Sequence, residues 1–460
     1  MPIAISFSWT SYHNFHGRCA ISTKVWTGGA ADIAQRDTGT VGGTWVQSDA
    51  LTLTINNQNL VITIGTATTT ANVATIVSQA WNASTRLANL LSDESLNIGG
   101  QEIPEFTEVR ASNSASTVIF TANTSGIPYT LTRAVSSAAG TFVISATQAA
   151  DGSHFYDNAN NWSGATLPVS SDKLVFQNNA IDLLYNISQA ATTNVSLQID
   201  ASYTGRIGLA PRNPTGYNEY RARHLTLGFA SDARSLVIGE GPGSASSRIN
   251  INANTSSPKV VIANTGIPEN LSRAAVDLIG GDADMDVTIR RGTLTLASES
   301  TNSASVSTLE IGFDVSRSTD AQVYVGDTTT IQEIKKRGGV LTVINASSGA
   351  AIATVTHMEG LIEVNGGVGA TLLDLQGGEL RWHSTGTIGT LKLSGAATFD
   401  VSRDHRAKGI TNPVERYSDS SRIIDPFQTI TNLRIDNNQV SDLGNLILGT
   451  DFRITRAATA

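Results

Sequence analysis

The sequence predicts a mainly β protein with three parts in order: an N-terminal arm, a small α+β domain and a long parallel β-solenoid. Two observations support this fold class. Ser, Thr, Asn and Gly are abundant whereas Met and Lys are scarce, a balance that favours strands and turns over helices. Short alternating apolar runs recur along the chain, and over residues 338–400 they follow each other at a nearly constant interval.

Length, charge and cysteine content narrow the class of protein further. A chain of 460 residues is longer than one ordinary globular domain, so we expect several units or one elongated unit. The formal net charge of -8, without a dense run of Lys and Arg, disfavours nucleic acid as a partner. A single cysteine, Cys19, excludes an intrachain disulfide.

The first residues lack the basic and apolar regions of a signal peptide, and no long apolar span follows. We therefore expect a protein made in a cytoplasm, with no membrane partner.

Residues 1–25 are predicted to form an anchoring arm. Its aromatic side chains are too dense for an isolated segment to bury, so they pack either on the chain's own domain or on a partner chain. The candidate contact residues are Phe7, Trp9, Tyr12, Phe15 and Arg18. His13, His16 and Cys19 have a spacing that suits a metal, but a fourth ligand and a helix signal are missing, so we expect no metal or other cofactor.

Residues 26–150 are predicted to form the small α+β domain. Apolar residues alternate with polar ones over 51–55 and again over 60–64, across the turn "NNQN", which predicts a hairpin. Over 73–81 the apolar residues fall on one stripe of a helix, with the threonines at 68–70 as candidate caps. Further strands are expected at 117–121, 129–132 and 141–144.

Four segments of this domain resemble a module of phage virion proteins and of some bacterial surface proteins. In this chain they are "VWTGGAADIAQRD", "ALTLTINNQNLVITIG", "TANVATIVSQAWNAS" and "VIFTANTSGIPYTLT". The resemblance covers about a quarter of the chain and implies a place on a virion or a cell surface. It brings no catalytic residues.

Residues 151–400 are predicted to form the β-solenoid. The segment "DNANNWSGATLPVSSDKLVF" places Trp162, Pro168 and Asp172 before a strand, and in this it resembles the entry to parallel β-helices of phage and bacterial surface proteins. A strand pair that cannot bury its apolar face alone must stack on its neighbours when it repeats at about 20 residues.

The repeat is most regular late in the predicted solenoid. Turn glycines recur at Gly339, Gly360, Gly378 and Gly395, so their spacing is a rung length. Upstream of each turn a second apolar run recurs, with Val355, Leu373 and Leu391 equally spaced, so each rung is expected to carry two strands. Leucine-rich repeats are the main alternative, because "ITNLRIDNN" at Ile430 fits their pattern, but that family needs a helical return that is absent here.

Residues 401–460 are predicted to leave the solenoid as a surface excursion and then form a C-terminal β cap. The period breaks after Asp400, over residues 401–427, in a stretch rich in charge and Pro. A long excursion of this kind is either a surface loop or a strap onto a neighbouring chain. The candidate contact residues are Arg403, His405, Arg406 and Lys408.

We expect no enzymatic activity. A saccharide-cleaving site would need two carboxylates in one groove, and Glu363 and Asp374 are candidates that we place on adjacent rungs, with Glu359 and Glu379 nearby. Solvated carboxylates on outward strand positions are the simpler interpretation. "GGDADMD" at Gly280 to Asp286 has the oxygen ligands for Ca²⁺ but occurs once, so a polar turn is favoured.

The leading functional hypothesis is a phage head decoration, or cement, protein that stabilises the shell as a homotrimer. Its partners would be the major capsid protein and copies of itself, and it would reside in the virion after assembly in the host cytoplasm. The alternative is a tail fibre or tailspike that binds, and in one version cleaves, a host surface glycan. A bacterial surface adhesin is the third hypothesis and would need an export signal.

Overall fold

The computed structural model describes most of the chain. The described residues are 21–65, 69–86, 104–194, 196–214, 216–229, 235–270, 272–312, 320–346, 351–431, 433–437 and 446–448. The predicted arm contacts Phe7, Trp9, Tyr12, Phe15 and Arg18 lie outside these residues, as do His13, His16 and Cys19.

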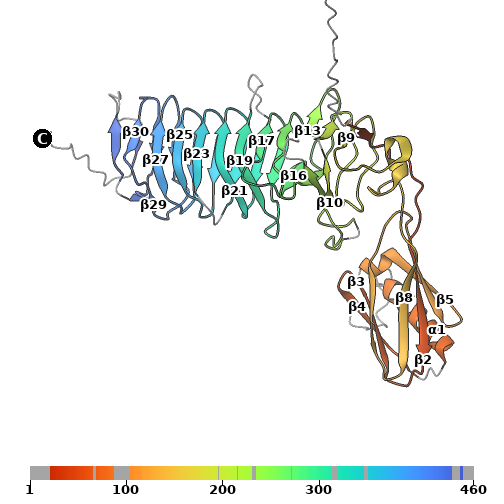
Figure 1. Ribbon diagram of the computed structural model, residues 1–460. Helices are drawn as coiled ribbons and strands as arrows, with labels where there is room; N and C mark the ends of the chain where they lie inside the picture. Colours follow the sequence, from red (N-terminus) through yellow and green to blue (C-terminus); the bar gives the residue numbers. More distant parts are fainter. Residues whose placement is uncertain are drawn as a thin grey trace, which may run out of the picture.

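Two long parallel sheets form a solenoid, and a small α+β domain projects from its N-terminal end (Figure 1). In the described part of the chain, one sheet has 13 strands and the other has 12. The strands of the first, in order, are β1 (Thr23–Val25), β9 (Lys173–Phe176), β11 (Ser196–Asp200), β13 (Ser235–Glu240), β15 (Lys259–Ile262), β17 (Asp286–Ile289), β19 (Ala304–Ile311), β21 (Thr329–Lys336), β23 (Ile352–His357), β25 (Ala370–Leu375), β27 (Ile388–Leu393), β30 (Val414–Arg416) and β33 (Ile435–Asn437).

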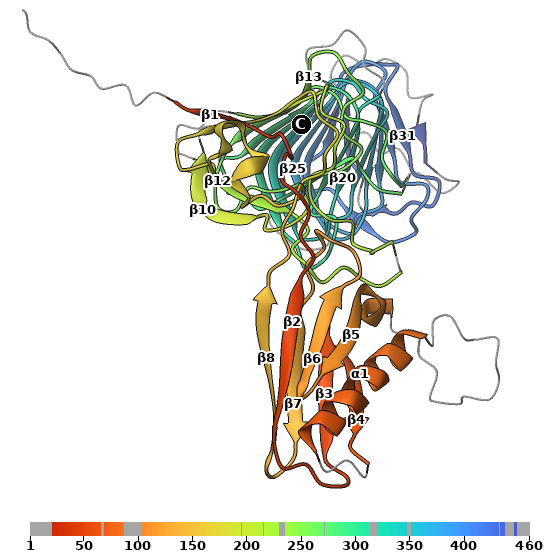
Figure 2. The ribbon, with the colours of Figure 1, turned by 90° about the vertical axis from the view of Figure 1, so that its right-hand side faces the viewer.

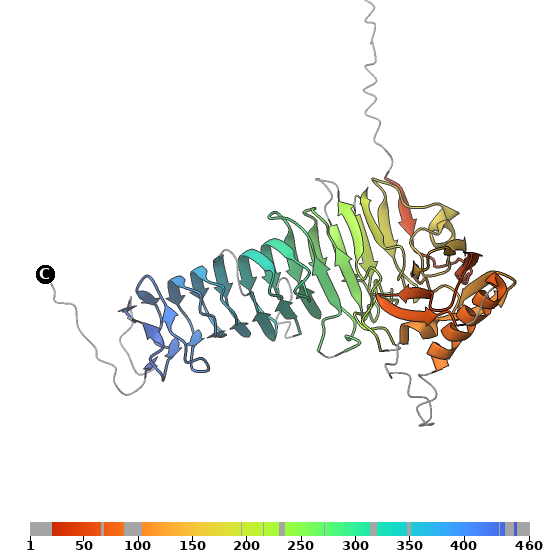
Figure 3. The same ribbon diagram turned by 90° about the horizontal axis from the view of Figure 1, so that it is seen from below.

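The second sheet supplies the other strand of each rung, so consecutive strands of the chain alternate between the two sheets (Figure 3). Its strands, in order, are β10 (Ser188–Asn194), β12 (Leu225–Phe229), β14 (Ile249–Asn252), β16 (Val276–Ile279), β18 (Thr293–Leu296), β20 (Gln322–Val325), β22 (Leu341–Ile344), β24 (Leu361–Val364), β26 (Glu379–Trp382), β28 (Thr398–Asp400), β31 (Arg422–Ile424) and β34 (Leu446–Ile447).

The register of the late rungs is the one that the sequence predicts. Val355 pairs with Leu373, and Leu373 pairs with Leu391, so the spacing of these three residues in the sequence is the step from one rung to the next. All three side chains are buried in the central apolar column. The prediction of two strands in each rung is confirmed, and the chain is a β-solenoid protein.

Tight turns between the sheets require glycine. Gly360 has a φ of +83°, a left-handed conformation that side chains other than glycine rarely adopt. A Cβ atom added at Gly360 would lie 2.2 Å from the carbonyl oxygen of Gly339, the turn glycine of the preceding rung. The short turns therefore stack directly on each other.

Three strand ends of the 13-stranded sheet place a basic side chain inside the solenoid. Lys336 and His357 pair with each other in the ladder, and Arg416 lies further along the same row. Each side chain donates to carbonyl groups of the turn that follows its strand, for example from Lys336 Nζ to the oxygen of Gly338 at 2.9 Å. Burial lowers the pKa of Lys336 to about 8 and that of His357 to about 4.

The small domain packs one helix and two antiparallel sheets around a separate apolar core (Figure 2). The stripe predicted over 73–81 faces this core, since Val73, Val77 and Trp81 are fully buried. Thr69 caps the helix by accepting a hydrogen bond from the amide of Asn72. The elements are β2 (Arg36–Gly43), β3 (Ala50–Ile55), β4 (Gln58–Thr63), α1 (Thr70–Arg86), β5 (Val109–Ser114), β6 (Thr117–Ala122), β7 (Leu131–Ser136) and β8 (Gly140–Gln148), with sheet orders β5-β6-β2-β8 and β4-β3-β7.

The segment just before the small domain belongs to the solenoid. β1 pairs in parallel with β9, and Trp26 packs edge-to-face on Trp162 with ring centroids 5.2 Å apart. The sequence analysis assigned these residues to the arm and to the small domain. The sequence gives no periodic signal for this pairing, because β1 is very short and its partner β9 comes only after the whole small domain.

The solenoid also continues beyond Asp400, where the sequence analysis expected an excursion. β30 pairs with β27, and β31 pairs with β28, so residues 414–424 supply a further rung. A second short ladder joins β29 (Lys408–Gly409) to β32 (Ile430–Thr431). The apolar period is hidden here because Arg416 occupies an interior position that Leu393 fills one rung earlier.

Candidate functional site

The two carboxylates considered for saccharide cleavage do not face each other. Glu363 lies on β24 in the 12-stranded sheet, whereas Asp374 lies on β25 in the 13-stranded sheet. Their neighbours on the next rung are basic, since Glu363 pairs with Arg381 and Asp374 pairs with Lys392. Although they belong to successive rungs, Glu363 and Asp374 lie on different sheets and do not form the paired carboxylates of a saccharide-cleaving groove.

The remaining acidic candidates have local partners. Glu379 forms an ion pair with Arg381 at 2.6 Å, and Glu359 lies in the turn before β24. In the "GGDADMD" turn, Asp282 accepts hydrogen bonds from the Ser257 hydroxyl and the Asp284 amide. Among the described residues, no three His, Cys, Asp or Glu side chains come together as they would around a metal ion.

The basic residues predicted as loop contacts are largely engaged within the chain. Lys408 is fully buried and ion-paired with Asp404, so its selection as a surface contact is wrong. Arg406 is exposed but also pairs with Asp404, and His405 packs against Phe427 in a tilted arrangement with ring centroids 4.1 Å apart. Arg403 is exposed.

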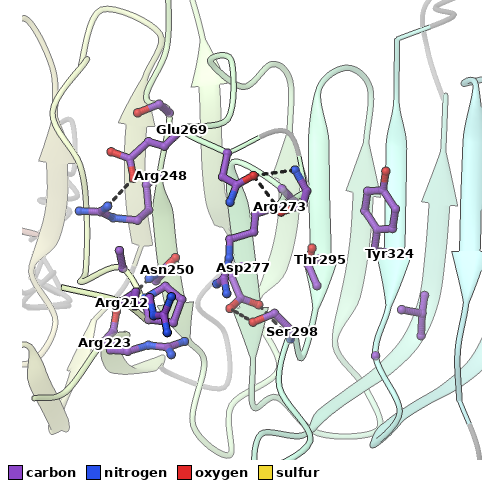
Figure 4. Close-up of a pocket in the computed structure, with 18 of the residues that line it drawn as sticks. Arg212, Arg223, Arg248, Asn250, Glu269, Arg273, Asp277, Thr295, Ser298 and Tyr324 are labelled. Carbon is purple, nitrogen blue, oxygen red and sulfur yellow. Dashed lines mark hydrogen bonds and ion pairs between the residues drawn. The ribbon is translucent and has the colours of Figure 1, made fainter. Parts of the chain in front are cut away.

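A polar groove of about 540 Å³ lies on the 12-stranded sheet, toward its N-terminal end (Figure 4). Its floor is a row of outward side chains on successive strands, in which Asn250 pairs with Asp277, Asp277 with Thr295, and Thr295 with Tyr324. Long loops before β12 and before β16 form its walls. The groove therefore runs along the solenoid axis, across several rungs.

A buried acid lies at the centre of the floor. Asp277 accepts hydrogen bonds from His224 Nε2 at 3.1 Å and from the Ser298 hydroxyl at 2.6 Å. Burial favours the neutral acid, but these hydrogen bonds hold the pKa of Asp277 below its ordinary value. Because the carboxylate lies between His224 and Ser298, the imidazole is not placed to activate the hydroxyl as in a hydrolytic triad.

Two arginines of the groove are held by acidic partners. Arg223 forms an ion pair with Glu299 at 2.5 Å, and Arg248 forms one with Glu269. Arg248 also donates to the carbonyl of Gly208 at 3.1 Å. These two guanidinium groups therefore stabilise the walls.

The other two arginines have free guanidinium groups. Arg212 and Arg273 are both exposed, and within the described part of the chain neither side chain has a hydrogen-bond or ion-pair partner. Figure 4 shows Arg212 beside Arg223 at one end of the groove, Arg273 over its middle and Tyr324 at the other end. The lining holds four arginines and two acids, a positive surface on a chain of net charge -8.

The loop that forms one wall of the groove also attaches the small domain. Arg221 pairs with Glu219 at 2.7 Å and donates to the carbonyl of Pro128 in the small domain at 2.9 Å. Its guanidinium lies over the ring of Tyr220, 5.0 Å from the centroid. Glu108 of the small domain accepts from Arg221 and from the Tyr217 hydroxyl. This cluster fixes the domain against the solenoid.

Sequence reasoning missed the groove, although one signal was present. Arg223, Arg248 and Arg273 are equally spaced in the sequence, at an interval close to the rung length in this part of the chain. A residue type that recurs at the rung length lies along one line of a solenoid.

No family model matches the chain, and a search of curated proteins finds no similar sequence. Among the described residues, no helix is long and apolar enough to cross a membrane.

Proposed function

We propose that the chain is a structural protein of a phage particle: a decoration protein that stabilises the head shell. In this proposal it assembles as a homotrimer in the host cytoplasm and binds the major capsid protein. The resemblance of four segments of the small domain to virion proteins supports the virion assignment.

The observation that carries a structural role is the unbroken core of the solenoid. Buried apolar side chains form one cluster from Trp26 to Leu448, so each rung supports the next along the whole described rod. The small domain is fixed to the N-terminal end of this rod through Arg221. The last residues of the predicted arm, Thr23–Val25, pair with β9 at the same end of the rod. Such a body suits attachment at one end and projection at the other.

Copy number in purified particles tests this proposal. The chain would be counted against the major capsid protein by quantitative mass spectrometry of particles from the phage that encodes it. Hundreds of copies per particle are expected for a shell decoration protein. Absence from particles would overturn the proposal.

A tail fibre or tailspike that binds a host glycan is the second candidate, and the groove is the observation that favours it. It provides free guanidinium groups, amides and an aromatic ring along one open surface. A handful of copies per particle, in multiples of three or six, would select this candidate over the first.

A further inference from the structure

We infer that the groove on the 12-stranded sheet binds an acidic polysaccharide through the carboxylates of its sugars. Arg212 and Arg273 would hold these carboxylates, and Tyr324 would pack against a sugar ring. The inference goes beyond the decoration role and does not depend on it, since it applies to any location of the chain in a particle.

The charge of the groove favours an acidic ligand. An unpaired guanidinium offers a planar fork of donors that matches a carboxylate, and the two groups form paired charge-assisted hydrogen bonds. The other two arginines of the groove are already neutralised by Glu299 and Glu269. Arg212 and Arg273 therefore remain available for an anionic ligand, among the residues that the structure describes.

The length of the groove favours a polymeric ligand. The floor passes over β14, β16, β18 and β20, and Asn345, which follows β22, completes the lining. Neighbouring strands are about 4.8 Å apart, so five strands span roughly 19 Å. A single sugar would fill only part of this length, whereas an oligosaccharide would reach from Arg212 to Tyr324.

The lining also suits a saccharide. It includes side chains with hydroxyl or amide groups, which can pair with the hydroxyl groups of sugars: Ser247, Asn250, Asn270, Ser272, Thr295, Ser298 and Asn345. Polar and charged side chains outnumber apolar ones in the lining, unlike in a typical site for a small apolar ligand. Tyr324 is the one aromatic residue of this lining, too few for the stacked bases of single-stranded nucleic acid.

Binding measurements with defined oligosaccharides test the inference. Oligomers of galacturonic acid and of sialic acid would be titrated into the full chain by calorimetry, alongside oligogalactose of the same length and oligomers of glycerol phosphate. At least one carboxylated oligomer is expected to bind, more weakly as salt is added, while oligogalactose does not. Binding of oligogalactose with equal affinity, tighter binding of glycerol phosphate, or no binding of either carboxylated oligomer would overturn the inference.

Two variants and one control locate the site. Arg273→Ala is expected to weaken binding of the carboxylated oligomer by about tenfold or more, because it removes a charge-assisted hydrogen bond to a carboxylate. Tyr324→Ala is expected to weaken binding as well, because it removes the ring that packs against a sugar. Arg422→Ala is the matched control, since Arg422 is an exposed arginine on β31 of the same sheet, away from the groove. Equal affinities for Arg273→Ala and Arg422→Ala would show that the ligand binds elsewhere.

Discussion

In both halves of the solenoid each rung contributes one strand to each sheet, but the connections between the strands differ in length. In the C-terminal half, Ile334, Val355, Leu373 and Leu391 pair in turn, so each step to the next rung is short and nearly constant. In the N-terminal half the steps are longer and uneven, and the step from Leu197 to its partner Leu236 is about twice as long as that from Leu373 to Leu391.

The extra residues of the long rungs form surface loops, and these loops supply the arginines of the groove and of the small-domain junction. The loop between β11 and β12 supplies Arg212 and Arg223 to the groove and Arg221 to the small-domain junction. The loop before β16 supplies Arg273. Regular rungs therefore build the rod, whereas the loops of irregular rungs form its groove and its junction with the small domain.

The largest expected effect comes from breaking the regular half. Leu373→Asp would place a carboxylate in the fully buried column between Val355 and Leu391. We expect a loss of more than about 4 kcal/mol in the free energy of unfolding, because a buried charge without a partner is costly. Thermal unfolding would measure it. Thr371→Asp is the control, because Thr371 is exposed on the same strand. An equal loss of stability in both variants would contradict the burial of Leu373 in an apolar column.

The second largest effect is expected from breaking the attachment of the small domain to the irregular half. Arg221→Ala would leave Glu219 and Glu108, both largely buried, without their cationic partner. Loss of one member of a buried ion pair costs about 3 to 5 kcal/mol, so we expect destabilisation of this size and a small domain that varies in orientation. Calorimetry and small-angle scattering would report the two effects. Arg110→Ala is the control, because Arg110 is an exposed arginine on β5. If the two variants give the same scattering profile, the junction does not depend on the Arg221 cluster.

The regular half also predicts a pH dependence of stability. His357 is fully buried and its pKa is about 4, so in the folded protein it stays neutral where the unfolded chain, with an ordinary pKa of 6.5, is protonated. Stability from this residue is complete above pH 6.5 and falls as the pH drops toward 4, by about 3 kcal/mol. Denaturant unfolding at several pH values would measure the slope.

His357→Leu is the matched variant, because Leu375 and Leu393 occupy the same position in the next two rungs. It should remove most of the pH slope between 6.5 and 4, at a cost of about 1 kcal/mol for the hydrogen bond to the Gly360 carbonyl. An unchanged slope would assign the pH dependence to other groups.

The smallest effect is expected at the outward acids of the regular half. Asp374→Asn keeps the size of the side chain and removes a partly exposed charge next to Lys392. Surface charge pairs contribute about 0 to 1 kcal/mol, so unfolding should change by less than about 0.5 kcal/mol. The affinity for the carboxylated oligosaccharide should stay the same. A tenfold loss of affinity would place the ligand site on the 13-stranded sheet and contradict the groove assignment.

The same comparison explains how much of the fold could be predicted. The regular rungs repeat apolar residues at a fixed interval, so the pairing of Val355, Leu373 and Leu391 follows from spacing alone. The helix whose apolar stripe ends at Trp81 could also be predicted, because a helix buries residues at a short, local period.

The groove and the ends of the solenoid could not be predicted in this way. Arg212 and Tyr324 line opposite ends of one groove because successive rungs stack, and each loop conformation depends on contacts that spacing does not encode. Interior basic residues such as Lys336 and Arg416 break the apolar pattern, since their charged ends bind turn carbonyls inside the core. At Arg416 the break conceals a rung from a search by hydrophobic period, whereas the rung of Lys336 is still marked by the turn glycine Gly339.

The most direct test of the account is hydrogen exchange on the full chain with and without a carboxylated oligosaccharide. We expect added protection in the loops before β12 and β16 and in β14, β16, β18 and β20, with none in β23 to β27. Protection centred on the regular rungs, or no change in the irregular half at saturating ligand, would contradict the claim that the irregular half forms the binding surface.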